Sequence, residues 1–223
     1  TQKRYYPLGE QAATLIGFSG KDGFGLEGLE NILDLELSGA PGKETIFRNA
    51  SRRPQITQEA IQGLDKKLTI DSRIQFYAYK HLSNYVVANN AKGGSVIVLD
   101  NISGEILAIA SYPSYNPNSP QRKIKRNRAL TDAFEPGSII KPLAVAKGID
   151  MGILASDQLI DTSPGFINLS GKTVSDPKNY YNLTVREVIA KSSQVGASKL
   201  ALLIGIDGLI SGYKGFGLSK PPS

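Results

Sequence analysis

The chain reads Phe134-Glu135-Pro136-Gly137-Ser138-Ile139-Ile140-Lys141-Pro142 a little past its middle. A serine and a lysine three residues apart share one face of a helix, so the Lys141 amine can reach the Ser138 hydroxyl and take its proton. Gly137 lets the backbone and a substrate approach closely, and a helix from about Ser138 to Met151 would aim free N–H groups at a developing oxyanion. This stretch predicts a nucleophile beside its base, at the start of a helix.

Pro142 is unusual inside such a helix. It has no N–H to return to the carbonyl of Ser138, and it disfavours the α conformation for Lys141. Backbone strain of this kind clusters at functional sites. Because Ser-x-x-Lys is a short pattern that also fits a solvated helix turn, the rest of the chain has to decide between the two interpretations.

Composition narrows the chemistry. The chain has 223 residues, a mass of 24.0 kDa and a net charge of +6, which favours anionic partners such as membranes, wall polymers or nucleic acid. It has no cysteine, so disulfides and thiolate metal sites are excluded while the compartment stays open. Its single histidine, His81, cannot build a Ser-His-Asp triad or a zinc site unaided. Lys141 is therefore the plausible base for Ser138, and we expect no metal and no cofactor.

Membrane and export signals are not expected within these residues. No apolar run approaches the roughly 18 to 20 residues of a membrane span, and the first residues do not form a signal peptide. We expect any anchor or export signal to lie outside this chain.

Elements expected in the first half point to a mixed α+β protein. Residues 1–64, rich in glycine and with an amphipathic segment at 26–37, read as a small appendage and linker, and residues 65–223 as the main domain. Asp71 is a good N-cap for a helix that keeps apolar spacing to about Ala88. Apolar runs at 95–99 and 105–110 predict a hairpin in the middle of a sheet, with helices covering both faces.

In the second half, a helix boundary attracts attention. Residues 168–171 predict a weak hairpin, and Thr184 with Glu187 forms a capping box that opens a helix. That helix should stop at Ser192-Ser193-Gln194, and another should run from Val195 to Ile204. The triplet would then sit at a joint between helices, where side chains can point into a cleft.

Two other patterns suggest different functions. The glycines of residues 23–28 match a dinucleotide-binding fingerprint, but no βαβ unit surrounds them and Arg48 stands where an acidic ribose ligand is wanted. The basic run at 122–128 could bind nucleic acid, although such a run is usually a solvated loop. We favour neither.

Taken in order, many short stretches resemble one family, the class B penicillin-binding proteins, and most closely their septal, cell-division members. The stretches that carry the resemblance are Tyr6-Pro7, Ile16-Gly17-Phe18, Gly25-Leu26-Glu27-Gly28-Leu29-Glu30, Leu68-Thr69-Ile70-Asp71 with Gln75, Gly104-Glu105-Ile106-Leu107-Ala108, Tyr112-Pro113-Ser114-Tyr115-Asn116-Pro117-Asn118, Arg126-Asn127-Arg128, Phe134-Glu135-Pro136-Gly137-Ser138, Lys191-Ser192-Ser193 and Val195-Gly196. The resemblance implies an incomplete penicillin-binding, serine β-lactamase-like transpeptidase fold with part of an N-terminal pedestal domain.

The resemblance also implies the activity, a peptidoglycan D,D-transpeptidase of septal wall synthesis. Ser138 would attack the penultimate D-Ala of a stem peptide with Lys141 as base, and Ser192 would relay the proton to the departing D-Ala. Gly137, Ser193 and Gln194 would contact substrate. β-Lactams would acylate the same serine.

The partners implied are peptidoglycan stem peptides on lipid-linked polymer, a septal glycosyltransferase and division proteins. The expected location is the periplasmic face of a bacterial inner membrane, through an N-terminal helix that this chain lacks. Nucleic acid is not an expected partner.

The chain departs from the family pattern at two points. The family's Ser-x-Asn motif ends here in Gln194, whose amide lies one methylene further out, and the family's Lys-Thr/Ser-Gly motif is absent. Lys172-Thr173 cannot replace that motif, because Val174 follows and Ser192 comes later. We therefore expect this piece alone to be inactive. The main alternative is a non-catalytic scaffold of the division complex, against which the intact Ser138/Lys141 pair argues; a β-lactamase or β-lactam sensor would not explain the glycine-rich appendage.

Overall fold

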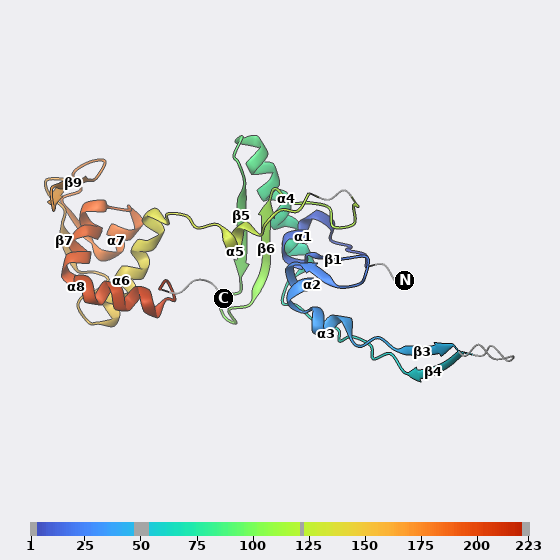
Figure 1. The fold of residues 1–223 in the computed structure, drawn as a ribbon. Helices are drawn as coiled ribbons and strands as arrows, with labels where there is room; N and C mark the ends of the chain where they lie inside the picture. Colours follow the sequence, from blue (N-terminus) through green and yellow to red (C-terminus); the bar gives the residue numbers. More distant parts are fainter. Residues whose placement is uncertain (1–3, 47–53, 121–122, 220–223) are drawn as a thin grey trace. The chain divides into compact units, whose positions relative to one another are not determined.

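The computed structural model describes residues 4–46, 54–120 and 123–219 (Figure 1). The chain divides into two compact units, Thr1–Asp132 (unit 1) and Ala133–Ser223 (unit 2). In both units short helices and antiparallel hairpins alternate, so the α+β class is confirmed. The boundary predicted between residues 64 and 65 separates the pedestal domain from the transpeptidase domain, and it differs from the division between these two units. It stays a prediction.

The first part of unit 1 consists of short elements. They are η1 (Gly9–Gln11), α1 (Ala13–Ile16), β1 (Phe18–Ser19), β2 (Gly25–Glu27), α2 (Gly28–Ile32), α3 (Asp34–Ser38), β3 (Lys43–Ile46) and β4 (Pro54–Gln58). The amphipathic segment predicted at 26–37 forms two short helices, which are separated at Leu33, where the backbone leaves the helical conformation. The Asp34 carboxylate at the start of α3 accepts a hydrogen bond from the Gly25 N–H of β2 at 2.7 Å. Arg48, which stands where the dinucleotide-binding pattern wants an acidic residue, lies outside the described residues.

The centre of unit 1 is a helix packed on a hairpin. As predicted, α4 (Ser72–Ala88) begins after Asp71, whose carboxylate accepts from the N–H groups of Arg73 and Ile74. The predicted hairpin is β5 (Gly94–Leu99) with β6 (Ile106–Tyr112). Leu82 and Val86 of α4 are buried against Ala110 of β6. Burial of these apolar side chains joins the two elements.

One face of this hairpin is covered by α4, and the other face only in part, contrary to the prediction that helices cover both. On the second face Ile109 and Ser111 of β6 are buried, and α5 (Arg128–Thr131) contacts both strands. Ile97 and Leu99 of β5 lie on that same face and are 45% and 58% exposed. The second face therefore lacks a full cover among the described residues.

The free edge of β6 is blocked by a buried side chain. Gln75, 0% exposed, donates to the Ile109 carbonyl at 3.0 Å and accepts from the Ile109 N–H at 2.9 Å. The amide thus replaces a neighbouring strand. Among the described residues no strand pairs with the other edge, that of β5.

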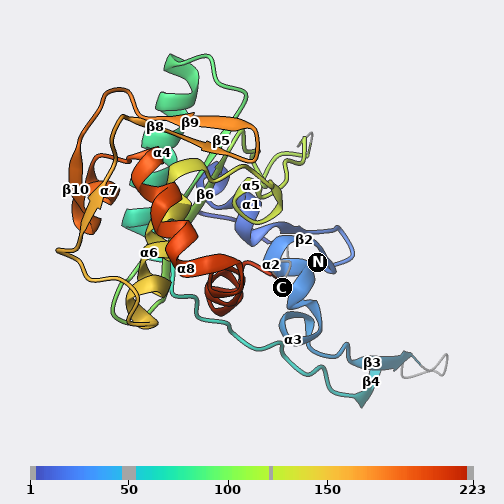
Figure 2. The same ribbon diagram turned by 90° about the vertical axis from the view of Figure 1, so that its left-hand side faces the viewer.

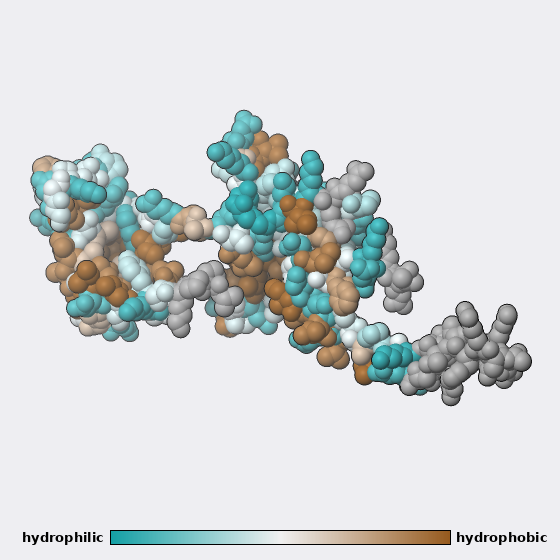
Figure 3. Space-filling view, in the orientation of Figure 1, coloured by the Kyte–Doolittle hydropathy of each residue, from teal (hydrophilic) through white to brown (hydrophobic). Residues whose placement is uncertain are grey.

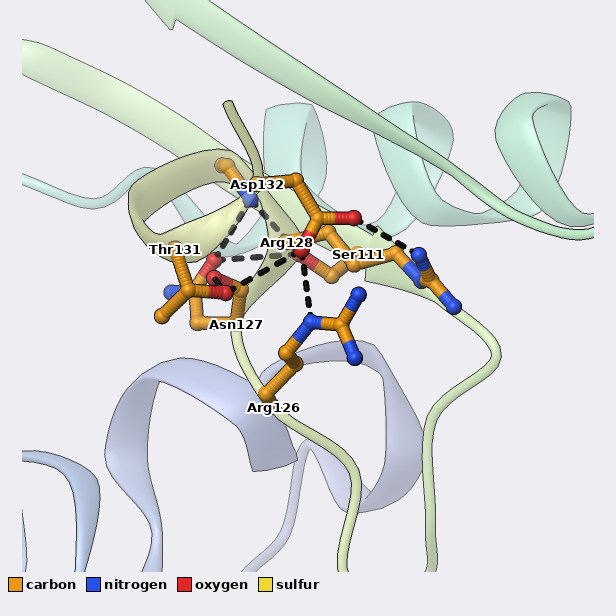
Figure 4. Close-up of polar contacts among 7 residues, drawn as sticks. Ser111, Arg126, Asn127, Arg128, Thr131 and Asp132 are labelled. Atoms are coloured by element: carbon orange, nitrogen blue, oxygen red, sulfur yellow. Dashed lines mark hydrogen bonds and ion pairs between the residues drawn. The ribbon is translucent and has the colours of Figure 1, made fainter. Parts of the chain in front are cut away.

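Unit 1 ends in a small polar cluster around α5 (Arg128–Thr131) (Figure 4). One Asp132 oxygen accepts from Arg126 Nε at 2.6 Å and the other from Arg128 Nη1 at 2.7 Å. These contacts lower the Asp132 pKa to about 2, with the Arg126 hydrogen bond as the largest cause. Two cations of the basic run are therefore tied to a carboxylate within the fold, which weakens the nucleic-acid interpretation.

Unit 2 packs its helices against two antiparallel strand pairs. Its elements are η2 (Gly137–Ile140), α6 (Lys141–Asp150), β7 (Leu159–Asp161), β8 (Phe166–Leu169), β9 (Lys172–Ser175), β10 (Asn182–Thr184), α7 (Val185–Ala190) and α8 (Gln194–Gly215). The pairs are the hairpin of β8 with β9, and β7 with β10, which flank that hairpin in the chain. Figure 2 shows α6 lying against α8. The buried residues between the elements are Val145, Leu154, Ile160, Leu183, Val185, Val188, Leu200 and Ile204. The predicted hairpin at 168–171 and the Thr184 capping box are both confirmed.

α8 continues to Gly215, but its helical backbone breaks at Gly205, so the predicted helix end at Ile204 is confirmed and a further helix follows it. As a whole α8 is long and apolar enough, by length and composition alone, to cross a membrane, which the sequence had not led us to expect. The break at Gly205 (φ 74°, ψ 165°), however, divides it into two shorter helices. Val195, Leu200 and Ile204 of the first are buried in the core of unit 2. Other apolar side chains of unit 2 remain exposed, as Figure 3 shows for the face in view.

Candidate active site

Ser138 lies in a tight turn that leads into α6. The sequence predicted an α-helix from about Ser138, but residues 137–140 form a 3-10 helix and α6 starts at Lys141. The Lys141 N–H donates to the Ser138 carbonyl, three residues back. Since Pro142 has no N–H to donate to that carbonyl, the 3-10 turn satisfies it instead. Gly137 has φ 57°, a conformation that glycine adopts without strain.

The 3-10 geometry brings the two chemical side chains into line. With three residues per turn, side chains at i and i+3 eclipse one another, so those of Ser138 and Lys141 leave the helix on the same side. Ser138 is exposed, and no described residue makes a hydrogen bond to its hydroxyl. The nucleophile candidate is open to solvent.

Lys141 reaches across to the joint between α7 and α8. Its Nζ lies 2.8 Å from the Ser192 carbonyl oxygen, 3.2 Å from the Ser192 hydroxyl and 3.4 Å from the Ser193 carbonyl oxygen. Ser192 and Ser193 come about fifty positions after Lys141 in the chain, and both lie within hydrogen-bond distance of its amine. The fold thus brings these three predicted site residues together. The hydrogen bonds fix where the amine sits.

The joint holds Ser192 in a left-handed conformation (φ 54°). The Ser192 N–H donates to the Ile189 carbonyl and the Ser193 N–H to the Val188 carbonyl, the pattern of a helix that ends with a left-handed residue. Glycine normally occupies this position, and another residue costs on the order of 1–2 kcal/mol there. A serine is thus held in a strained conformation with its hydroxyl beside the Lys141 amine.

Ser193 and Asp176 fix the start of α8. The Ser193 side chain is fully buried, donates to Asp176 Oδ2 at 2.6 Å and accepts from the Gly196 N–H at 2.9 Å. Asp176 Oδ1 accepts from the N–H groups of Gln194 at 2.5 Å and Val195 at 3.3 Å. Sequence reasoning gave Asp176 no role at the site, because nothing near it in the chain links it to a triplet 16 residues later.

The structure does not bring the Gln194 side chain into this network. It is exposed, and its amide makes no hydrogen bond to any described residue. Only the backbone N–H of Gln194 takes part, through Asp176. The predicted substrate contacts of Gly137, Ser193 and Gln194 stay predictions.

Burial favours the neutral form of the Lys141 amine. Desolvation is the larger effect and lowers the Lys141 pKa, and the negative charge of Asp176 acts in the opposite direction. A neutral amine beside a hydroxyl can accept its proton, so the arrangement can support attack by a serine on a carbonyl carbon. In the described part of the chain no group of three or more His, Cys, Asp or Glu side chains could hold a metal.

A profile of the penicillin binding protein transpeptidase domain matches residues 94–223. The peptidoglycan D,D-transpeptidase FtsI of Escherichia coli K12 is 40% identical over 98% of this chain and 38% of its own length. The probable peptidoglycan D,D-transpeptidase PenA of Neisseria gonorrhoeae is 41% identical over 97% of this chain and 38% of its own length.

A solved structure agrees with these matches. Penicillin binding protein 3 of Mycobacterium tuberculosis, complexed with ampicillin, superposes with a TM-score of 0.83 at 31% identity, over 96% of this chain and 46% of that one. The chain thus spans less than half the length of the proteins that it matches. The resemblance inferred from the ordered motifs, including its closeness to the septal enzymes, is confirmed. The chain belongs to the penicillin-binding protein family, and its residues 94–223 are transpeptidase-domain sequence.

Proposed function

We propose that the protein containing this chain is a serine-type peptidoglycan D,D-transpeptidase of septal wall synthesis. The observation that carries the proposal is the placement of the Lys141 amine. The amine donates hydrogen bonds to the Ser192 carbonyl and hydroxyl oxygens, and the Lys141 side chain leaves the helix on the same side as the Ser138 side chain. Family membership and the names of the relatives support the reaction type.

In the first half of the proposed reaction, Lys141 takes the proton of the Ser138 hydroxyl while Oγ attacks the carbonyl carbon of the penultimate D-Ala. The carbon–nitrogen bond to the terminal D-Ala then breaks. The proton passes from Lys141 through the Ser192 hydroxyl to the departing amine, and an ester on Ser138 remains. The hydrogen bond between Lys141 Nζ and Ser192 Oγ, at 3.2 Å, is the path for this proton.

In the second half, an amine of a neighbouring stem peptide attacks the ester. Its proton returns by the same path to the Ser138 oxygen, a new amide forms, and the serine is restored. A β-lactam would take the place of the stem peptide in the first half of the reaction. Ser138 would attack its ring carbonyl, and the opened drug would stay bound to Ser138 as an ester. Gly137 and Gln194, which are exposed, would contact the bound peptide. Ser193 is fully buried, so its proposed part is to hold the start of α8 beside the bound peptide.

The place of action proposed for the whole protein is the periplasmic face of the inner membrane, with a septal glycosyltransferase and division proteins as partners. Support comes from the similarity to FtsI, a peptidoglycan transpeptidase. The ampicillin complex of a related penicillin binding protein 3 supports β-lactams as ligands.

The test is covalent labelling of the protein that contains this chain. Incubation with benzylpenicillin should raise the intact mass by one drug molecule, and Ser138→Ala should abolish the increase while the circular dichroism spectrum is unchanged. Ser156→Ala, at another exposed serine of unit 2, is the matched control and should label normally. A Ser138→Ala protein that still gains the mass would refute the assignment.

A further inference from the structure

Asp176 accepts three hydrogen bonds at the candidate site, although the sequence did not single it out as a site residue. It lies directly after β9, and its own N–H donates to the Gly165 carbonyl at 2.9 Å, so its backbone is anchored away from α7 and α8. From there its carboxylate accepts the Ser193 hydroxyl and the N–H groups of Gln194 and Val195. One side chain therefore joins a hairpin to the start of α8.

The joint needs such a contact because its backbone is strained. Ser192 holds φ 54°, and strained residues persist where the surrounding structure over-determines them. The α7 carbonyls fix Ser192 from one side through the N–H groups of Ser192 and Ser193. Asp176 fixes the chain from the other side, at Ser193 and Gln194, so the Ser192 hydroxyl has little freedom to move away from Lys141.

The Ser193 hydroxyl is buried at the start of α8, where it accepts from the Gly196 N–H. Close packing here requires glycine at position 196, because a Cβ built on it would lie 3.0 Å from Ser193 Oγ and 2.6 Å from a methyl carbon of Val188. The proton of the Ser193 hydroxyl is directed to Asp176 at 2.6 Å.

The charge of Asp176 also acts on the amine. The negative charge of Asp176 raises the Lys141 pKa, against the effect of burial. Several other charged groups on the neighbouring elements have partners of their own: Lys147 pairs with Asp150, Lys191 pairs with Glu187, and Lys199 donates to the Asp161 carbonyl. The remaining charged side chains on these elements are Lys172 of β9, Arg186 of α7, and Asp207 and Lys214 of α8. One carboxylate thus accepts the hydrogen bonds that hold the joint between α7 and α8 and also acts by its charge on the Lys141 amine.

We propose that Asp176 is a positioning residue for the reaction: its hydrogen bonds to Ser193, Gln194 and Val195 hold Ser192 against Lys141. A positioning carboxylate so near the amine should also shift the pH range in which Lys141 is a base. This inference rests on the proposed function. It assigns no direct contact between Asp176 and substrate.

Two variants separate hydrogen bonding from charge. Asp176→Asn removes the charge but keeps an oxygen acceptor for the N–H groups of Gln194 and Val195. Its NH2 group can donate to the Ser193 hydroxyl, which reverses the direction of that hydrogen bond. Asp176→Ala removes both the charge and the hydrogen bonds. Asp150→Asn, on α6 in the same unit and outside the site, is the matched control.

The experiment measures the benzylpenicillin acylation rate of the protein that contains this chain, between pH 5 and 10, for the parent and the three variants. Since the neutral amine is the base, the rate rises with pH through the Lys141 pKa and then levels off. Removing the Asp176 charge lowers the Lys141 pKa. In Asp176→Asn the acylation rate should therefore rise at lower pH than in the parent, and its plateau at high pH should lie within about threefold of the parent rate. Asp176→Ala should show the same movement and a plateau lower by about 10- to 100-fold, the effect of a misplaced group. Asp150→Asn should match the parent.

Thermal unfolding of each variant shows the fraction that is folded, and rates are compared per folded molecule. An Asp176→Ala plateau equal to that of the parent, or an Asp176→Asn profile that does not move, would overturn the inference. If Asp176→Ala does not fold, the Asp176→Asn profile alone decides. A parent that is not acylated on Ser138 would instead refute the proposed function, so the two failures are distinguishable.

Discussion

The Lys141 amine lies 2.8 Å from the Ser192 carbonyl oxygen and 3.2 Å from the Ser192 hydroxyl, although the two residues are 51 positions apart. The amine leaves the start of α6, and the hydroxyl sits on the strained turn that ends α7. Because the hydrogen bond joins two different helices, the geometry of the proposed proton path depends on how unit 2 folds.

Replacing Lys141 by arginine should nearly abolish acylation. Arginine keeps the positive charge but cannot give up its proton in a protein, so no base remains for Ser138. The loss of a general base is typically worth about 100- to 10,000-fold in rate. The measurement is the rate of mass gain with benzylpenicillin, with Lys147→Arg, also on α6, as the control. A Lys141→Arg protein acylated within tenfold of the parent would show that another group is the base.

The pH dependence of the parent follows from the direction of the Lys141 pKa shift. Burial lowers the pKa from 10.5, so the neutral base becomes available at lower pH than for a free lysine side chain. The acylation rate should therefore rise through a pKa below 10.5 and not fall again before the protein unfolds in alkali. A rate that falls as pH rises between 6 and 9 would contradict a lysine base.

Gln194→Asn should speed acylation modestly. The Gln194 side chain is exposed, and its amide has no partner among the described residues. A shorter amide has one rotatable bond fewer to freeze on binding substrate, worth about 0.5 kcal/mol, or roughly a twofold gain in rate. The rate constants of the two proteins are compared at one pH. A marked slowing would mean that the site is built around glutamine.

How far the sequence could predict the site depended on how local each signal was. The Asp71 cap, the Thr184 capping box and the spacing of Ser138 and Lys141 are decided by neighbours in the chain, so they could be read directly. The 3-10 turn at Ser138 was suggested by Pro142 but not predicted. Asp176 acts across 17 positions, and no local pattern announces such a contact.

The same distinction explains the error at the hairpin. Ile97 and Leu99 are apolar, as a strand covered on both faces would be, but coverage depends on elements distant in the sequence. Pairing of β5 with β6 was predictable from the turn between them, whereas the state of the second face was not. In α8 the predicted end at Ile204 agrees with the break at Gly205, whereas the helix that follows Gly205 was not predicted.

Gln75→Ala should destabilise unit 1. The buried amide pairs both backbone groups of Ile109, and removing it leaves them without a partner, at about 1–3 kcal/mol for each group. The free energy of unfolding in urea is the measurement, and Ser83→Ala on the exposed side of α4 is the control. A loss below about 0.5 kcal/mol would mean that water or a backbone shift replaces the amide.

A polypeptide of these 223 residues alone should react with penicillin much more slowly than the longer protein. The sequence holds no Lys-Thr/Ser-Gly motif, and the edge of β5 pairs with no described strand. The resemblance to the family implies that the strand carrying this motif supplies the second oxyanion donor, and the loss of one donor costs about 100- to 1000-fold in rate. The two acylation rates are measured under identical conditions, and rates within a few-fold of each other would show that Ser138, Lys141 and Ser192 suffice.

The most direct test of the central claim is to locate the penicillin adduct by peptide mass spectrometry on the protein that contains this chain. Trypsin does not cut between Lys141 and Pro142, so digestion releases residues 129–147 as one peptide, in which Ser138 is the only serine. The account predicts that this peptide gains the mass of one benzylpenicillin and that fragmentation places it on Ser138. An adduct on any other peptide, such as one carrying Ser192, or no adduct at all, would contradict it.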